Sequence, residues 1–172
     1  MTADALAVPV PAVIAQVEVR AFVEREAPGI LAYFARRTDR DDAADLLGET
    51  LVVVWRRVAT IPTDEERARM WLYGVARKVL SQHRRSSVRR SALAERLRLE
   101  LREQPAIVDP TEHDEVRAHI AALPAVDREI IELVYWEGFS LVEVAGILGM
   151  RQPTVRSRHA RARATLKAAL EA

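Results

Sequence analysis

Side chains that could carry out covalent chemistry are few in this chain of 172 residues. It has no cysteine, which excludes a disulfide scaffold, a thiolate zinc site and a cysteine nucleophile. His113 and His119 share no helix face with a carboxylate at a metal-ligand spacing, and the acids near them fit the solvated start of a helix. A glycine-rich phosphate loop and a nucleophile elbow are also missing. We therefore expect a protein that is not an enzyme and uses no metal or cofactor.

Two arginine-rich stretches, residues 77–90 and 151–167, contain no acid. Between them, at residues 100–115, the charged side chains are mainly acidic. This pattern favours two surfaces that bind a polyanion, joined by a segment that does not. The alternative is a pair of solvated helix faces, and the presence of two acid-free stretches argues against it.

The composition indicates a helical protein. Aromatic residues make up 5% of the chain and glycine only 6 residues, unlike a sandwich or barrel of β-branched and aromatic strands. We expect an all-α fold of two small domains. No apolar run approaches the roughly 20 residues of a membrane span, so no membrane insertion is expected. Residues 1–16 lack the basic start of a signal peptide, which favours a cytoplasmic protein with a loose N-terminal arm.

The first domain is expected over residues 17–91. Helical pieces are predicted at residues 17–26 and 29–37, separated at Pro28-Gly29, and a longer helix at residues 39–59. The core-facing stripe of the longer helix is predicted to be Ala43, Leu47, Leu51, Val54 and Val58. Other apolar side chains lie off this stripe, so the helix is either central in the bundle or covered by a partner.

The next helix leads into the first basic stretch. Thr63 and Glu66 fit a capping box at its start, and its predicted apolar stripe is Leu72, Val75 and Val79. The periodicity then weakens while acids and prolines accumulate. We expect a linker over residues 92–111, with one cluster of helical turns at residues 93–101.

The second domain is expected over residues 112–172. Helices are predicted at residues 112–122 and 124–137, and Ser140 and Glu143 fit a capping box that opens a third. Gly149 fits the end of that helix. A final helix opens at Pro153, and its predicted apolar face is Val155, Ala162, Leu166 and Leu170. His159 falls on the same face, which favours a packed, hydrogen-bonded histidine over a DNA contact or a pH switch.

The last two helices have the form of a helix-turn-helix, whose second helix enters the major groove of DNA by its N-terminal residues. Side chains there can hydrogen-bond bases or phosphates. The predicted DNA contacts are Arg151, Gln152, Pro153, Thr154, Arg156, Ser157, Arg158, Arg161 and Arg163. An ordinary helical hairpin with a basic exterior is the alternative.

Both domains resemble bacterial RNA polymerase sigma factors. Residues 42–56, with Asp42-Ala-Ala-Asp45-Leu46 and Trp55-Arg56, are similar to the core of sigma region 2. Residues 71–85 are similar to the promoter-melting segment that follows it. Leu123-Pro124 and residues 140–163 resemble region 4. Both segments in this order, with an acidic linker between them, resemble the extracytoplasmic-function (ECF) class of the sigma-70 family, which has only these two domains.

The resemblance implies a function and partners. A protein of this class binds the clamp and flap of core RNA polymerase, directs recognition and melting of promoter DNA, and is commonly held by an anti-sigma factor. The residues implied to bind polymerase are Asp42, Asp45, Leu46, Glu49, Val53 and Trp55. Those implied to bind the −10 element are Arg69, Trp71, Arg77, Lys78, Gln82, His83, Arg84, Arg85, Arg89 and Arg90. The helix-turn-helix would read the −35 element, and the acidic linker would follow the RNA-exit path.

Three positions depart from the usual pattern of the class, namely Gly48, Lys78 and His159, and Lys78 implies a different base preference at the −10 element. Two other functions fit part of the sequence. A stand-alone helix-turn-helix repressor or activator would use residues 140–163 but leave residues 42–55 without a role. A sigma-like interaction protein that has lost promoter binding would have no need of the arginine clusters.

Overall fold

The computed structural model describes residues 10–98 and 112–171. Within these ranges the chain is helical apart from short connections, and it contains no strand. The predicted all-α fold is therefore confirmed. The chain divides into two compact units, residues 1–84 and residues 85–172.

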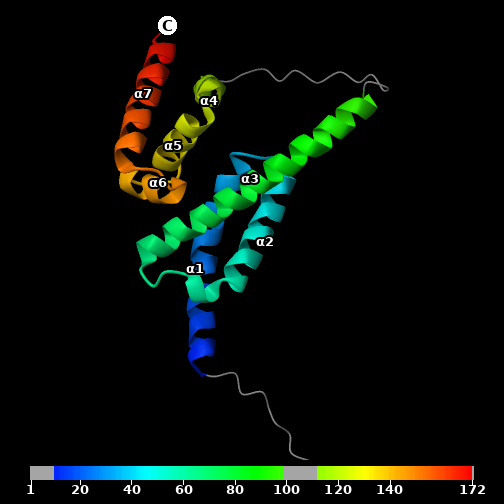
Figure 1. Cartoon of the computed structure of the whole chain (residues 1–172), viewed down its shortest axis with the longest axis vertical. Coiled ribbons are helices and arrows are strands. Elements are labelled where there is room, and N and C mark those ends of the chain that lie inside the picture. The colour runs from blue at the N-terminus through cyan, green and yellow to red at the C-terminus, as the bar shows by residue number, and fades with distance from the viewer. Residues whose placement is uncertain (1–9, 99–111, 172) are drawn as a thin grey trace, which may run out of the picture. The chain divides into compact units, whose positions relative to one another are not determined.

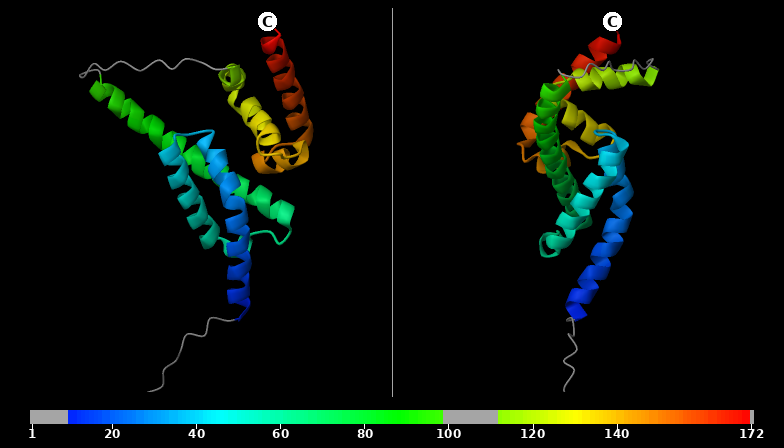
Figure 2. Two further views of the ribbon diagram at one scale, coloured as in Figure 1. Left: turned by 180° about the vertical axis from the view of Figure 1, so that it is seen from behind. Right: turned by 90° about the vertical axis from the view of Figure 1, so that its right-hand side faces the viewer.

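The first unit is a bundle of α1 (Val10–Ala35), α2 (Arg40–Arg56), the short 3-10 helix η1 (Val58–Thr60) and the first part of α3 (Glu65–Arg98). α1 and α2 lie side by side and run in opposite directions, and α3 crosses both (Figures 1 and 2). Side chains from all three helices are almost completely buried, among them Phe34, Val54 and Leu72. This packing leaves one face of α2 and one face of α3 for other contacts.

α1 is one continuous helix, so the predicted break at Pro28-Gly29 is wrong. A proline inside a helix costs about 3 kcal/mol because it removes a backbone hydrogen bond. Buried side chains nevertheless recur at helical spacing on both sides of it, at Val19, Val23, Ile30 and Phe34. Burial of this stripe outweighs the cost of the proline, whose ring is exposed. The helix also includes residues 10–16, which were predicted to be a loose arm, whereas residues 1–9 lie outside the described residues.

α2 has Asp39 as its N-cap, at the predicted start of the helix, and ends at Arg56, shortly before its predicted end. Its core face is rotated from the predicted stripe, since the buried positions are Ala43, Leu46, Thr50 and Val54. Thr50 is accommodated in the core because its Oγ1 donates a hydrogen bond of 2.7 Å to the Leu46 carbonyl. Because threonine is polar, a stripe predicted from apolar residues alone does not include Thr50.

α3 is capped by Asp64, not by the predicted box of Thr63 and Glu66. The backbone N–H of Arg67 donates to Oδ1 of Asp64 at 2.8 Å. The predicted stripe of Leu72, Val75 and Val79 is buried. The helix continues to Arg98, past the predicted start of the linker, and it includes the first part of the turn cluster predicted at residues 93–101. Residues 99–111 lie outside the described residues.

The second unit contains α4 (Glu112–Ala122), α5 (Ala125–Tyr135), α6 (Leu141–Leu148) and α7 (Gln152–Leu170). The helix predicted at residues 112–122 is confirmed, and the next is shorter than predicted, with Pro124 as its N-cap. Part of the core is formed by Ile120, Leu123, Ile131 and Ala162, with Trp136 and Leu166 packed against it. Leu170 is 53% exposed, so the predicted apolar face of α7 ends before it. In the described ranges no helix is long and apolar enough to cross a membrane.

Candidate nucleic-acid interface

The turn between α6 and α7 is fixed by local contacts. The N–H of Ser140 donates to Oε2 of Glu143 at 2.7 Å, and the N–H of Glu143 donates to Oγ of Ser140 at 3.3 Å, which confirms the predicted capping box. Gly149 ends α6 with a left-handed φ of 64°. α7 then opens at Gln152 with Pro153 in its first turn. The caps of α6 and the start of α7 therefore fix the short turn between these helices, as in a helix-turn-helix.

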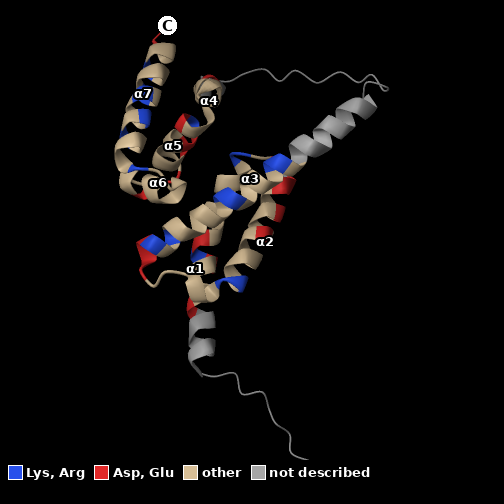
Figure 3. Cartoon of the chain, in the orientation of Figure 1, with Lys and Arg blue, Asp and Glu red and all other residues tan. Residues whose placement is uncertain are grey.

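α7 presents a basic face to solvent. Figure 3 shows basic residues at successive turns of this helix. The predicted DNA contacts that are exposed are Arg151, Gln152, Pro153, Arg156, Ser157, Arg161 and Arg163, and Thr154 is half-buried. On the opposite face, Val155 and Ala162 are buried in the core. The first turns of α7 can therefore enter a major groove while later arginines contact phosphates.

Arg158, another predicted DNA contact, pairs with an acid of α5. Its Nη1 donates to Oδ1 of Asp127 at 2.8 Å. Asp127 lies in the first turn of α5 and is 5% exposed, so its carboxylate depends on this partner. The guanidinium of Arg158 therefore joins α7 to α5 in this structure, and its contact with DNA stays a prediction.

His159 is packed, as predicted, but one ring nitrogen lacks the predicted hydrogen bond. Its ring stacks on Tyr135, with ring centroids 5.9 Å apart and an interplanar angle of 19°. Its Nε2 is buried without a hydrogen-bond partner. Burial lowers the pKa of His159 below its ordinary value, and the nearby Arg163 lowers it further. The folded chain therefore favours the neutral imidazole.

α3 carries a second basic face, opposite its core stripe. Of the predicted −10 contacts, Lys78, Gln82, Arg84 and Arg85 are exposed, and Trp71 and Arg77 are half-buried. Arg67, which the sequence analysis missed, is exposed one helical turn before Trp71, and that spacing could have revealed it. Arg89 and Arg90 belong to α3, but their side chains lie outside the described residues.

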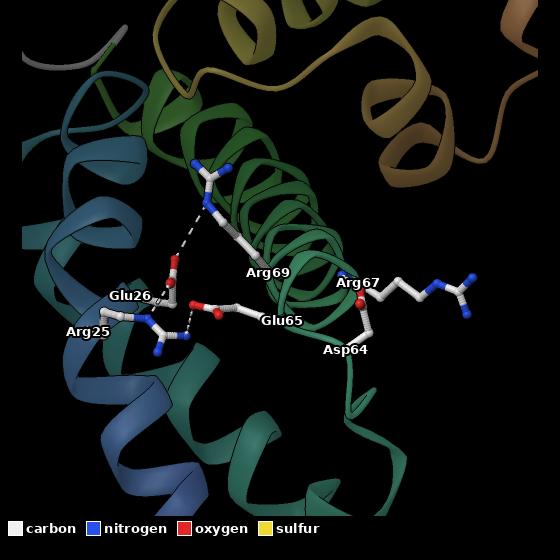
Figure 4. Close-up of polar contacts among 6 residues, drawn as sticks. All are labelled: Arg25, Glu26, Asp64, Glu65, Arg67 and Arg69. Carbon is white, nitrogen blue, oxygen red and sulfur yellow. Dashed lines mark hydrogen bonds and ion pairs between the residues drawn. The ribbon is translucent and has the colours of Figure 1, made fainter.

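Two other predicted −10 contacts of α3 face acids of α1 and α2. Nε of Arg69 lies 3.6 Å from Oε2 of Glu26, and its guanidinium carbon lies 5.2 Å from the centre of the Tyr73 ring. Figure 4 shows Arg69 turned toward Glu26, whereas Arg67 points away from that acid. Nε2 of His83 lies 3.1 Å from Oδ2 of Asp42. The structure therefore places Arg69 and His83 apart from the exposed basic face.

The outward face of α2 combines acids with apolar side chains. The predicted polymerase contacts on or beside it are Asp45, Glu49 and Trp55, which are exposed, and Val53, which is half-buried. Val52, which the sequence analysis missed, is 48% exposed and lies one turn before Trp55. Leu46, also a predicted polymerase contact, is 1% exposed and lies in the core, not on the outward face. Asp42 is half-exposed and faces His83.

A helix-turn-helix with an exposed basic recognition face, in a chain whose other helical unit also carries a basic face, defines a DNA-binding protein. In the part of the chain that the structure describes, no group of three or more His, Asp or Glu side chains could hold a metal ion. Residues 22–90 match the family Sigma-70 region 2, and residues 113–166 match Sigma-70, region 4. The chain belongs to the ECF RNA polymerase sigma factors.

This assignment also rests on curated relatives. The chain is 30% identical over 149 residues to the ECF RNA polymerase sigma factor SigL of Mycobacterium tuberculosis, and the match covers 81% of each chain. It is 33% identical over 133 residues to the ECF RNA polymerase sigma factor EcfG of Rhodopseudomonas palustris, covering 76% of this chain and 72% of that one. The sigma-factor resemblance of the sequence is confirmed.

Solved structures share the fold. CnrH, in complex with the cytosolic domain of CnrY, superposes with a TM-score of 0.62 at 27% identity, covering 92% of this chain and 96% of CnrH. The sigma factor RpoE of Bartonella quintana, in complex with the anti-sigma factor NepR, superposes with a TM-score of 0.68 at 22% identity. That match covers 90% of this chain and 97% of RpoE.

Proposed function

We propose that this chain binds core RNA polymerase through the outward face of α2 and directs it to promoter DNA through α3 and α7. The observation that carries the polymerase contact is the exposure of Val52 and Trp55 beside Asp45, because large apolar side chains exposed together on one helix face are typical of a protein interface. Acids beside them would meet basic side chains of polymerase. The chain would act in the cytoplasm, without a catalytic site of its own.

The promoter contacts are divided between the two basic faces. On α7, the exposed side chains from Arg151 to Ser157 would read the −35 element, and Arg161 and Arg163 would contact its phosphates. On α3, Lys78 and the exposed arginines would bind the −10 strand, and half-buried Trp71 would stack on an unpaired base. Recognition of duplex and of melted DNA would thus fall to different units.

Transcription by reconstituted holoenzyme tests this function. Core polymerase from the source organism is combined with the chain, and RNA 5′ ends made from fragmented genomic DNA are mapped. We expect starts that share −35 and −10 sequences and disappear without the chain. Tight duplex binding by the chain alone, with no effect on polymerase, would instead identify a stand-alone repressor or activator.

We also propose that an anti-sigma factor controls the chain. RpoE, which shares its fold, is bound by the anti-sigma factor NepR. An exposed face such as that of Val52 and Trp55 gives a partner a surface that polymerase also needs. The protein encoded beside this gene is the partner to test: it should co-purify with the chain and displace it from core polymerase. Co-purification without displacement would count against this control.

A further inference from the structure

α3 is held from its inward side by two acids of neighbouring helices. Glu26 of α1 lies against Arg69, and Asp42 of α2 lies against His83. Arg69 and His83 stand at opposite ends of the α3 segment whose stripe is buried, and both share the inward side with that stripe. The exposed basic residues of α3 lie on the other side.

In each contact, one of the two side chains is largely buried. The side chain of Glu26 is 13% exposed and that of Arg69 is 32% exposed. The side chain of His83 is 17% exposed and that of Asp42 is 46% exposed. Partly buried pairs are less screened by solvent than exposed ones, so they restrain the helices that they join.

The Glu26 contact belongs to a larger cluster at the start of α3 (Figure 4). Nε of Arg25 donates to Oε1 of Glu26 at 3.2 Å, and Nη2 of Arg25 lies 3.0 Å from Oε1 of Glu65 in the first turn of α3. Two adjacent residues of α1 therefore hold two successive turns of α3. At the other end, His83 directly precedes the exposed Arg84 and Arg85.

We propose that Glu26 and Asp42 are positioning residues, which fix through Arg69 and His83 the direction in which α3 presents its basic face to promoter DNA. The proposal rests on the function proposed above. Asp42 then orients α3 and does not contact polymerase. Arg69 and His83 stabilise the packing of the bundle and do not contact DNA. These roles differ from those implied by the sequence resemblance, and they predict a different pattern of mutant defects.

A double-mutant cycle on Asp42 and His83 tests the inference. Full-length variants are assembled with core polymerase on a mapped promoter, and melting is followed by permanganate reactivity of unpaired thymines. We expect Asp42→Ala and His83→Ala each to slow melting about fivefold, and the double variant about as much as either alone, because each single change already breaks the contact between these two residues. Affinity for core polymerase, measured by fluorescence anisotropy, should stay within about twofold of wild type.

The matched control is Asp41→Ala, which removes an exposed acid from the same turn of α2. It should change neither the melting rate nor the affinity for core polymerase. A second cycle uses Glu26→Ala and Arg69→Ala, with the exposed Glu24 changed to alanine as its control. Asp42→Glu, which keeps the carboxylate, should recover part of the melting rate. Thermal unfolding of each variant checks folding, and an unfolded variant is replaced by Asp42→Asn or Glu26→Gln.

Three results would overturn the inference. Multiplying effects in the double variant, about 25-fold in all, would show independent contacts. A loss of polymerase affinity of about tenfold in Asp42→Ala would make Asp42 a polymerase contact. Single variants that melt the promoter at the wild-type rate would remove any positioning role. Failure of the wild-type chain to bind polymerase would refute the proposed function, which is a separate outcome.

Discussion

Arg158 of α7 and Asp127 of α5 are 31 residues apart in the chain. Their contact holds α7, the second helix of the helix-turn-helix, against α5. Replacing Arg158 by alanine leaves a buried carboxylate without its partner. We expect a loss of about 2 kcal/mol in the stability of the helix-turn-helix unit, since the arginine itself is only partly buried. Hydrogen exchange of the α5 and α7 amides measures this loss separately from the first unit.

Arg161→Ala is the matched control for this prediction, because Arg161 is exposed on the same helix. It should leave exchange in α5 and α7 close to wild type, within about 0.5 kcal/mol. If Arg158→Ala keeps the wild-type hydrogen-exchange protection but changes the preferred bases, then Arg158 contacts DNA and does not stabilise this unit.

His159 makes the second unit sensitive to acid. Burial and Arg163 lower its pKa in the folded chain, so folding disfavours the protonated ring. Its contribution to stability is therefore complete above the unfolded pKa of about 6.5 and declines as the pH falls below it. Thermal unfolding at pH 7.5 and 5.5 should show a smaller acid-induced loss in His159→Phe than in wild type. Equal losses in the two chains would contradict this assignment.

Exposed residues of the interface are easier to predict than inward-facing charges. The exposed arginines of α7 follow from the helix-turn-helix pattern alone. The side-chain types of Arg158, Arg69 and His83 favour DNA contacts, although their spacing to Val155, Leu72 and Val79 places them near the core side of their helices. Their partners lie in other helices, where periodicity along one segment gives no information.

At the scale of the element, local chemistry predicts α6 and its caps, but not the continuity of α1. A capping box and a left-handed glycine act within a few residues, so their effect can be read from the sequence. Pro28 predicts a break for the same local reason. The stripe from Val19 to Phe34 that keeps α1 whole gains its stability from packing against other helices, which no local signal contains.

Gly29 of α1 lies next to Tyr73 of α3. A Cβ atom at this position would lie 3.0 Å from the Tyr73 hydroxyl, which is buried between these helices. We expect Gly29→Ala to lower thermal stability in the wild-type chain. In a Tyr73→Phe background the same change should raise stability by up to about 1 kcal/mol, since alanine favours helix over glycine. Chemical denaturation of the four chains measures both effects, and an equal effect of Gly29→Ala in the two backgrounds would refute this contact.

At the scale of the whole molecule, function depends on charge that is balanced in total but segregated along the chain. The 26 basic and 25 acidic residues leave a net charge of +1, yet α3 and α7 each carry exposed cations within a stretch that contains no acid. With about six phosphate contacts, the logarithm of the affinity for promoter duplex should fall with the logarithm of salt concentration with a slope of about −5.

Arg161→Ala should flatten this slope by about one and weaken binding to all sequences alike. Gln152→Ala should keep the slope and change the preferred bases of the −35 element. Anisotropy titrations at several salt concentrations, on promoter and scrambled duplexes, separate the two effects. The same flattening from both variants would contradict the division into phosphate and base contacts.

The proposed polymerase-binding face of α2 is tested by measuring the affinity of the full chain for core RNA polymerase and comparing it with that of the double variant Asp45→Arg, Trp55→Ala. Glu18→Arg, which reverses an exposed acid on α1, is the control. We expect nanomolar binding by wild type and Glu18→Arg, and a loss of about 100-fold or more in the double variant. Unchanged binding by the double variant would show that α2 is not the polymerase-binding surface, and no binding by wild type would contradict the proposed function itself.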